Sequence, residues 1–139
     1  MTKMPVLLAL LTVACPAYAE ERKDPVVITP ILKTMSTISG QPIVLPRRDV
    51  QLIVTICEIA PGAVLPVHQH PYQRYGYVLS GTFAARNQVS GVTTAYRPGD
   101  FIVESVGQRH SGVNIGRDPV KLLVIDQVEA GTNNVITGN

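Results

Sequence analysis

The sequence contains little cysteine, little charge and no tryptophan. Only two of its 139 residues are cysteines, and 16% are charged. One of the two, Cys15, falls in an N-terminal segment that we expect to be removed, so Cys57 would be the only cysteine of the mature chain. A single cysteine excludes an internal disulfide, and the fold must therefore be held by an apolar core.

A strong excess of one charge sign is also missing. Twelve basic residues stand against ten acidic ones, and the formal net charge is +2. Arg47 and Arg48 are adjacent but belong to no larger basic patch. Proteins that bind nucleic acid or a membrane surface usually carry such a patch, so we expect neither partner.

The apolar run near the N-terminus, Val6–Ala14, is too short to cross a bilayer as a helix. It follows Lys3 and precedes Ala17-Tyr18-Ala19, an order typical of a secretory signal peptide cleaved after Ala19. The sequence therefore predicts a signal peptide over residues 1–19 and a single mature domain over residues 20–139. The mature protein is expected to be periplasmic or secreted, without a membrane segment.

Helical periodicity is not sustained for three turns anywhere in the sequence. Eleven prolines and eleven glycines separate short β-branched and apolar stretches, which is typical of an all-β sandwich or barrel. The longest stretch, Val50–Ile59, is apolar on both faces, and we expect it to be buried between two layers. Cys57 lies within it and is expected to be buried and unreactive.

All three histidines fall in two glycine-punctuated stretches. His68 and His70 stand two residues apart on a predicted strand, so both imidazoles point to the same face. His110 lies on a later strand, which turns can bring beside the first. A neutral imidazole is the commonest protein ligand of transition metals. The three histidines are therefore predicted to bind one divalent transition metal, with Fe, Mn, Zn and Ni as the candidates.

Glycines and histidines at fixed spacings carry a further signal. The matching positions are Gly62, His68, His70 and Gly81 in a first motif, and Gly99, Gly107, His110 and Asn114 in a second, where Ser105 replaces a usual proline. With these motifs the sequence resembles the cupin superfamily over roughly residues 50–128. The resemblance implies a double-stranded β-helix (jelly-roll) barrel with a metal inside, a small-molecule ligand and pairing into a homodimer. It also implies a structural hydrogen bond at Asn114.

The sequence departs from the cupin pattern at the glutamate that usually completes the metal site. The spacing puts Arg74 there, or Tyr75 if one more spacer residue is counted. Arginine cannot ligate a metal, and its charge about 5 Å from a divalent ion would be repelled by roughly 6–7 kcal/mol at an effective dielectric of about 20. Three alternatives follow. Arg74 turns away and Tyr75 or Tyr77 faces the cavity, or an anion separates Arg74 from the metal, or no metal binds.

Arg74, Tyr75 and Tyr77 are accordingly the candidate substrate-binding residues. Arginine would fix a carboxylate, and tyrosine would line a pocket with an apolar ring and a polar tip. A salt bridge and ordinary sheet packing are the structural alternatives. Glu104 is the nearest other acid, either as a ligand or general base or as a residue on an exposed face. The pattern identifies no catalytic residue.

Three functions remain open at this stage. The first is a metal-dependent enzyme acting on a small molecule, such as an oxygenase, because thiol dioxygenases of the cupin superfamily also lack the glutamate. The second is an exported module that captures a small anionic ligand without catalysis. The third, a metal-free barrel with a structural role, is disfavoured because all three histidines keep their register.

Overall fold

The computed structural model describes residues 26–138, which form strands and turns but no helix. The strands are β1 (Val50–Ile59), β2 (Val64–Gln69), β3 (Arg74–Ser80), β4 (Phe83–Asn87), β5 (Thr93–Tyr96), β6 (Phe101–Val103), β7 (His110–Asn114), β8 (Val120–Glu129) and β9 (Ile136–Thr137). The expected all-β fold is confirmed. Over the described range no helix is long and apolar enough to cross a membrane. The predicted signal peptide lies outside the described residues.

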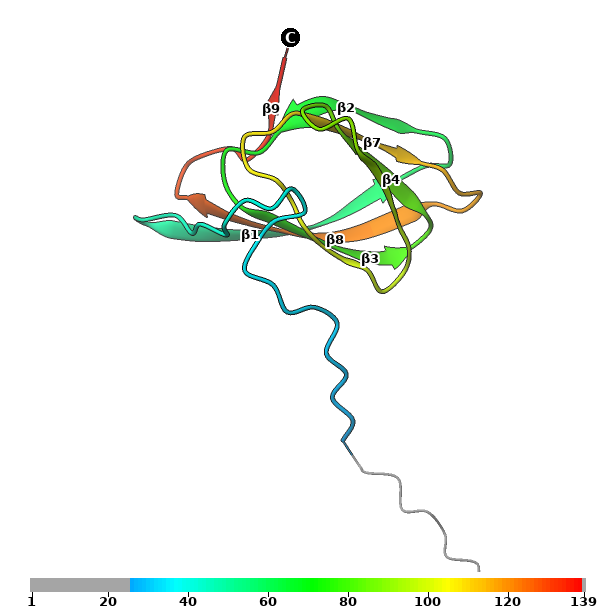
Figure 1. Cartoon of the computed structure of the whole chain (residues 1–139), viewed down its shortest axis with the longest axis horizontal. Coiled ribbons are helices and arrows are strands. Elements are labelled where there is room, and N and C mark those ends of the chain that lie inside the picture. The colour runs from blue at the N-terminus through cyan, green and yellow to red at the C-terminus, as the bar shows by residue number, and fades with distance from the viewer. Residues whose placement is uncertain (1–25, 139) are drawn as a thin grey trace, which may run out of the picture.

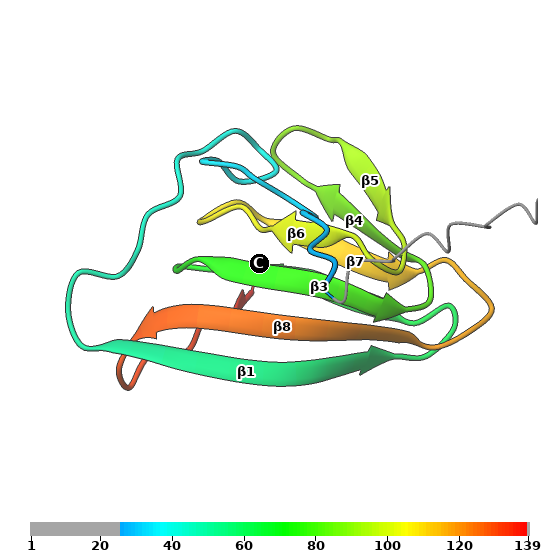
Figure 2. The same cartoon turned by 90° about the horizontal axis from the view of Figure 1, so that it is seen from below.

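The strands form two antiparallel sheets that face each other (Figure 1). One sheet has the order β1-β8-β3-β6, and the other has the order β5-β4-β7-β2-β9. Figure 2 shows β1, β8 and β3 side by side, with β1 at the outer edge. This arrangement of two facing sheets agrees with the predicted jelly-roll barrel.

The chain crosses between the two sheets several times. One of these crossings, from β3 to β4, takes place at Gly81. Its φ angle is +77°, and a Cβ atom there would lie 2.8 Å from the carbonyl oxygen of Pro119. Both the left-handed conformation and this close approach require glycine. The motif glycine therefore serves the crossing between sheets. Asn114 is also structural, since its Nδ2 donates to the carbonyl oxygens of Ile59 at 2.9 Å and Asp118 at 2.8 Å.

The apolar core lies between the sheets and is seen most clearly along β8. Alternate residues of this strand are buried, and most of them are apolar: Val120, Leu122, Val124 and Val128. Asp126 stands in the same inward row and is only 4% exposed. A buried carboxylate requires partners that compensate its lost hydration, and these are described below.

The expectation that Val50–Ile59 is buried on both faces is wrong. Within the described residues β1 pairs only with β8, and the four apolar side chains of its outer face are 52–59% exposed: Val50, Leu52, Val54 and Ile56. Hydrophobicity on both faces does not distinguish a central strand from an edge strand, because the strand order depends on distant pairings. Cys57 points to the inner face, where it is half-buried rather than fully buried.

Residues 26–49 contain no strand and contact the outer face of the four-stranded sheet. The Ile38 amide donates to the carbonyl oxygen of Val103 at 2.9 Å. Apolar residues of this segment and of the sheet line a groove together: Ile31, Leu32 and Ile43 with Tyr75, Phe101 and Val103. This contact fixes which side of β3 is the outside of the barrel.

Candidate metal centre

The three histidines meet where β2 and β7 run together. His68 lies on β2 directly opposite His110, the first residue of β7. His70 follows β2 and forms a bridge with Val106. The ligand nitrogens of the three rings all lie within 4.8 Å of one another. The three histidine side chains therefore lie close together, as the sequence predicted.

A main-chain carbonyl orients each imidazole ring. The Nδ1–O distances are 2.7 Å for His68 with Pro66, 2.6 Å for His70 with Asn134, and 2.9 Å for His110 with Gln108. Because a carbonyl oxygen only accepts, each Nδ1 donates its hydrogen. Nε2 then keeps a lone pair in a neutral ring and carries a second hydrogen in a protonated one. Outer hydrogen bonds of this kind fix the tautomer and direction of metal-binding histidines.

Glu104 completes the cluster from the end of β6. Its Oε2 atom lies 3.1 Å from Nε2 of both His70 and His110, and those two nitrogens are 3.2 Å apart. Burial alone would raise the pKa of Glu104, but its contacts with His110 and His70 outweigh burial and hold this pKa far below the usual range. Glu104 is therefore a carboxylate that faces the cavity, and the exposed-face alternative is wrong.

The pKa values of the histidines respond in opposite directions. Burial lowers the pKa of His68. Burial also acts to lower the pKa of His110, but the hydrogen bond to Glu104 outweighs it and raises this pKa. Three Nε2 lone pairs and a carboxylate oxygen repel one another unless a cation lies among them. Protons on the rings or a metal ion can supply that charge, and the donor set suits a divalent transition metal.

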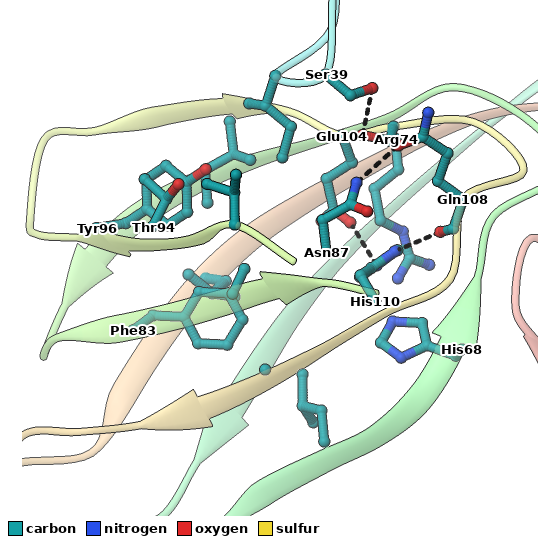
Figure 3. Close-up of a pocket in the computed structure, with 18 of the residues that line it drawn as sticks. Ser39, His68, Arg74, Phe83, Asn87, Thr94, Tyr96, Glu104, Gln108 and His110 are labelled. Carbon is teal, nitrogen blue, oxygen red and sulfur yellow. Dashed lines mark hydrogen bonds and ion pairs between the residues drawn. The ribbon is translucent and has the colours of Figure 1, made fainter. Parts of the chain in front are cut away.

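Arg74 points into the barrel beside this cluster and pairs with Asp126. The Arg74 Nε and Nη2 atoms donate to the two carboxylate oxygens at 2.7 and 2.9 Å. Asn134 Nδ2 donates to Asp126 Oδ1 at 2.5 Å. Of the alternatives for Arg74, the structure thus shows the salt bridge, with the guanidinium still bordering the cavity (Figure 3).

Tyr75 and Tyr77 lie on the outer face of β3, so the expectation that one of them faces the cavity is wrong. Side chains alternate along the strand, and Gly76 and Val78 take the inward positions with Arg74. Tyr75 Oη donates to Gln127 Oε1 at 3.0 Å. Both tyrosine rings pack against Phe101, with centroids 6.1 and 6.4 Å apart.

The cavity beside the histidines has a volume of about 490 Å³. Figure 3 shows His68, His110, Glu104 and Arg74 at one end and Phe83, Thr94 and Tyr96 at the other. Apolar side chains form much of the remaining wall: Leu65, Ile102, Leu122 and Val124. The polar groups are therefore gathered at one end of a largely apolar chamber.

Asn134 is a site residue that sequence reasoning missed. It is 2% exposed, its carbonyl oxygen orients His70, and its amide contacts Asp126. These contacts span 64 and 8 positions in the chain, and no local pattern marks them. The sequence did mark Glu104 as a candidate, because it is an acidic residue six positions before His110, which begins the next strand.

Comparison with known proteins supports the fold. A family profile described as "Cupin domain" matches residues 55–126. No curated protein matches the sequence. Among solved structures, the chain is similar to the polyketide cyclase RemF from Streptomyces resistomycificus. The identity is 26% and the TM-score 0.53, over 63% of this chain and 62% of that chain.

Two further solved structures are similar. The oxalate decarboxylase of Lactobacillus farciminis, in a formate complex, is 26% identical with a TM-score of 0.54, over 62% of this chain and 26% of that chain. A conserved double-stranded β-helix protein from Klebsiella pneumoniae is 21% identical with a TM-score of 0.54. That match covers 80% of this chain and 97% of the other, and it shows the fold alone.

Proposed function

The chain belongs to the cupin family, and we propose that it is a metal-dependent enzyme acting on a small molecule inside its barrel. His68, His70 and His110 would hold a divalent transition metal: Fe, Mn, Zn or Ni. One observation carries the proposal. Each Nδ1 donates to a backbone carbonyl, which leaves the Nε2 lone pair of a neutral ring available for a metal, and the ligand nitrogens of the three histidines lie within 4.8 Å of one another.

A bound metal would polarise a substrate oxygen, activate water or, if redox-active, take part in oxygenation. The protein contributes the orientation of the donors and the shape of the cavity. A chamber of about 490 Å³ is within the usual size range of small-molecule sites, roughly 300–1,000 Å³. Its apolar wall, which includes Phe83, Ile102 and Leu122, would exclude water around an apolar substrate body.

Catalysis is favoured over simple ligand capture by two observations. Two of the similar structures, each 26% identical to this chain, are described as a cyclase and a decarboxylase, both of them enzymes. The anionic-ligand alternative depended on a free Arg74 charge, and this charge is paired with Asp126. What still supports ligand capture is that the similar decarboxylase was solved with the small anion formate.

Metal content and turnover test the proposal together. Protein purified without chelators is expected to contain about one transition-metal ion per barrel by mass spectrometry. Dioxygen uptake and product formation would then be measured with a panel of small thiols, phenols and carboxylates. Turnover that is lost in His68→Ala supports the enzyme. Tight retention of a carboxylate without turnover would favour the binding module, with or without metal, and protein that takes up no metal would contradict the enzyme.

We also propose export, on the signal-peptide pattern of residues 1–19. Intact-mass measurement of the protein from its native host should show cleavage after Ala19. A soluble cytoplasmic protein that retains residues 1–19 would contradict the proposal.

A second copy of the chain is the partner that we propose for β1. This edge strand exposes an apolar row (Val50, Leu52, Val54 and Ile56). Antiparallel pairing of two β1 edges is self-complementary, as a two-fold axis requires. It would satisfy a strand edge that has no partner strand within residues 26–138. Sedimentation should show a dimer that Val54→Lys weakens. A monomer at all concentrations would contradict this pairing.

A further inference from the structure

We propose that Glu104 is the fourth protein ligand of the metal centre, and that it supplies from a neighbouring strand the carboxylate that position 74 lacks. The inference rests on the proposed metal site. It assigns a role to a residue that lies within the span of the second motif but is not one of its matching positions. The site still has a carboxylate. It is supplied by Glu104, at the end of β6, and not by position 74 on the neighbouring strand β3.

Strand register places Glu104 beside position 74. Tyr75 pairs with Val103 between β3 and β6, so Glu104 is the next cross-strand neighbour and faces Arg74. Its amide donates to the carbonyl oxygen of Arg74 at 2.9 Å. On the other side of β3, Arg74 pairs with Asp126 of β8. Asp126, Arg74 and Glu104 therefore form one row across the inner face of the sheet.

The charges in this row are divided between two tasks. Arg74 binds Asp126 through two donors, at 2.7 and 2.9 Å, and no ion pair joins Arg74 to Glu104 within residues 26–138. Asp126 neutralises Arg74, which would otherwise repel a divalent ion. The Glu104 carboxylate does not pair with Arg74 and is directed at His70 and His110 instead.

The spacing of the donor atoms suits a single metal ion. With bonds of about 2.1 Å, two ligand atoms around a tetrahedral or octahedral transition metal are about 3.0–3.4 Å apart. Glu104 Oε2 lies 3.1 Å from Nε2 of His70 and of His110, and the two nitrogens are 3.2 Å apart. Three edges of a coordination polyhedron are thus already present.

Gln73 holds Glu104 in this place. The Gln73 side chain is fully buried, and its Nε2 donates to the carbonyl oxygens of Arg74 at 3.1 Å and Glu104 at 2.9 Å. Together with the amide of Glu104 bonded to Arg74, this bridge ties the end of β6 to β3. The carboxylate is therefore positioned by its backbone as well as by its contacts with histidine.

Titration with Co²⁺ tests the assignment, because its visible spectrum reports the ligand set while calorimetry reports the affinity. Glu104→Gln should bind Co²⁺ more than about 100-fold more weakly than wild type, since even residues that only orient a ligand cost about 10- to 100-fold. Its spectrum should also change. Glu58→Gln is the matched control, because that carboxylate is on the surface, paired with Lys121 at 3.0 Å, and it should change neither quantity.

The outcomes separate this inference from the proposed function. Wild type that binds no Co²⁺ would overturn the metal site itself. If wild type binds and Glu104→Gln binds equally well with the same spectrum, only the Glu104 assignment fails. If Glu104→Gln does not fold, the infrared difference spectrum of wild type on Zn²⁺ binding decides. A shifted carboxylate stretch supports ligation, and an unchanged carboxylate region overturns it.

Discussion

Two charged clusters share the inner face of this barrel, and they differ in whether their partners are complete. In the first, the Asp126 carboxylate accepts hydrogen bonds from Arg74 and Asn134. In the second, ring nitrogens of three histidines gather beside the Glu104 carboxylate. The first cluster is closed and needs nothing more, whereas the second is open and requires a cation. Position 74 belongs to the closed cluster, although the family pattern would place it in the open one.

The largest effect is expected from emptying the open cluster. Replacing both His68 and His70 with alanine should abolish transition-metal binding, because two of the three convergent nitrogens are removed. The fold should survive, since the apolar residues of β8 and its neighbours form the core. Gln69→Ala, between the two histidines, is the matched control and should bind metal normally. Equal metal affinity in the double variant and in wild type would show that the histidines are not ligands.

Breaking the closed cluster should instead affect stability. Arg74→Ala leaves the buried Asp126 carboxylate without its counter-charge, and removing one partner of a buried pair costs about 3–5 kcal/mol. Metal affinity should stay equal or rise, because a nearby positive charge is lost. Denaturant unfolding and metal titration measure the two effects. The exposed pair of Lys121 and Glu58 is the control, and Lys121→Ala should cost less than about 1 kcal/mol. If Arg74→Ala and Lys121→Ala lower the free energy of unfolding by the same amount, the Arg74–Asp126 pair is no more important to stability than a surface pair.

The pH dependence of metal-free protein should sharpen the contrast. The Glu104–His110 contact lowers the pKa of Glu104 and raises that of His110. Its stabilisation should therefore be lost as pH falls below the ordinary Glu104 pKa of 4.5. It should also be lost as pH rises above the ordinary His110 pKa of 6.5. The difference in unfolding free energy between wild type and Glu104→Gln isolates this contact and should peak between these values. With metal bound, stability should rise with pH, since histidine must be deprotonated to ligate.

The smallest effect concerns Cys57, which lines the cavity. Burial raises the pKa of its thiol, while Arg74 lowers this pKa and Glu104 raises it. Labelling by a thiol reagent should be slower than for an exposed cysteine. It should slow further in Arg74→Ala and quicken in Glu104→Gln. If the wild type is labelled rapidly, and both variants are labelled at the same rate, then neither Arg74 nor Glu104 influences the Cys57 thiol.

Sequence patterns predicted the parts of this molecule that depend on local spacing. The strands and the shared face of His68 and His70 follow from positions close together in the chain, whereas the structural role of Asn114 was implied by the family resemblance. Burial of β1 was predicted wrongly, because its position at the sheet edge depends on pairing with β8, about 70 residues away in register. The same limit applies to Tyr75 and Tyr77. Alternation separates them from Arg74 but does not tell which side faces inward.

Glu104 illustrates the limit most clearly. Its distance from His110 in the sequence does not reveal that β6 pairs with β3, and without that register Glu104 cannot be placed beside position 74. A motif gives spacings along the chain but not the register between strands. It therefore does not predict which residue of a neighbouring strand can replace a missing ligand. The sequence shows that position 74 is not glutamate. Only the pairing of β3 with β6 shows that Glu104 lies beside this position.

The carbonyl of Asn134 has a consequence for biosynthesis. It orients His70, yet it is synthesised 24 residues after His110, the last of the three histidines. A chain that has folded only as far as β7 therefore holds every histidine but lacks the contact that aims one of them. A ribosome-bound intermediate should capture metal poorly, and loading should await release and closure of the barrel. The ion acquired would then be chosen by the compartment in which folding finishes, rather than by the one in which translation takes place.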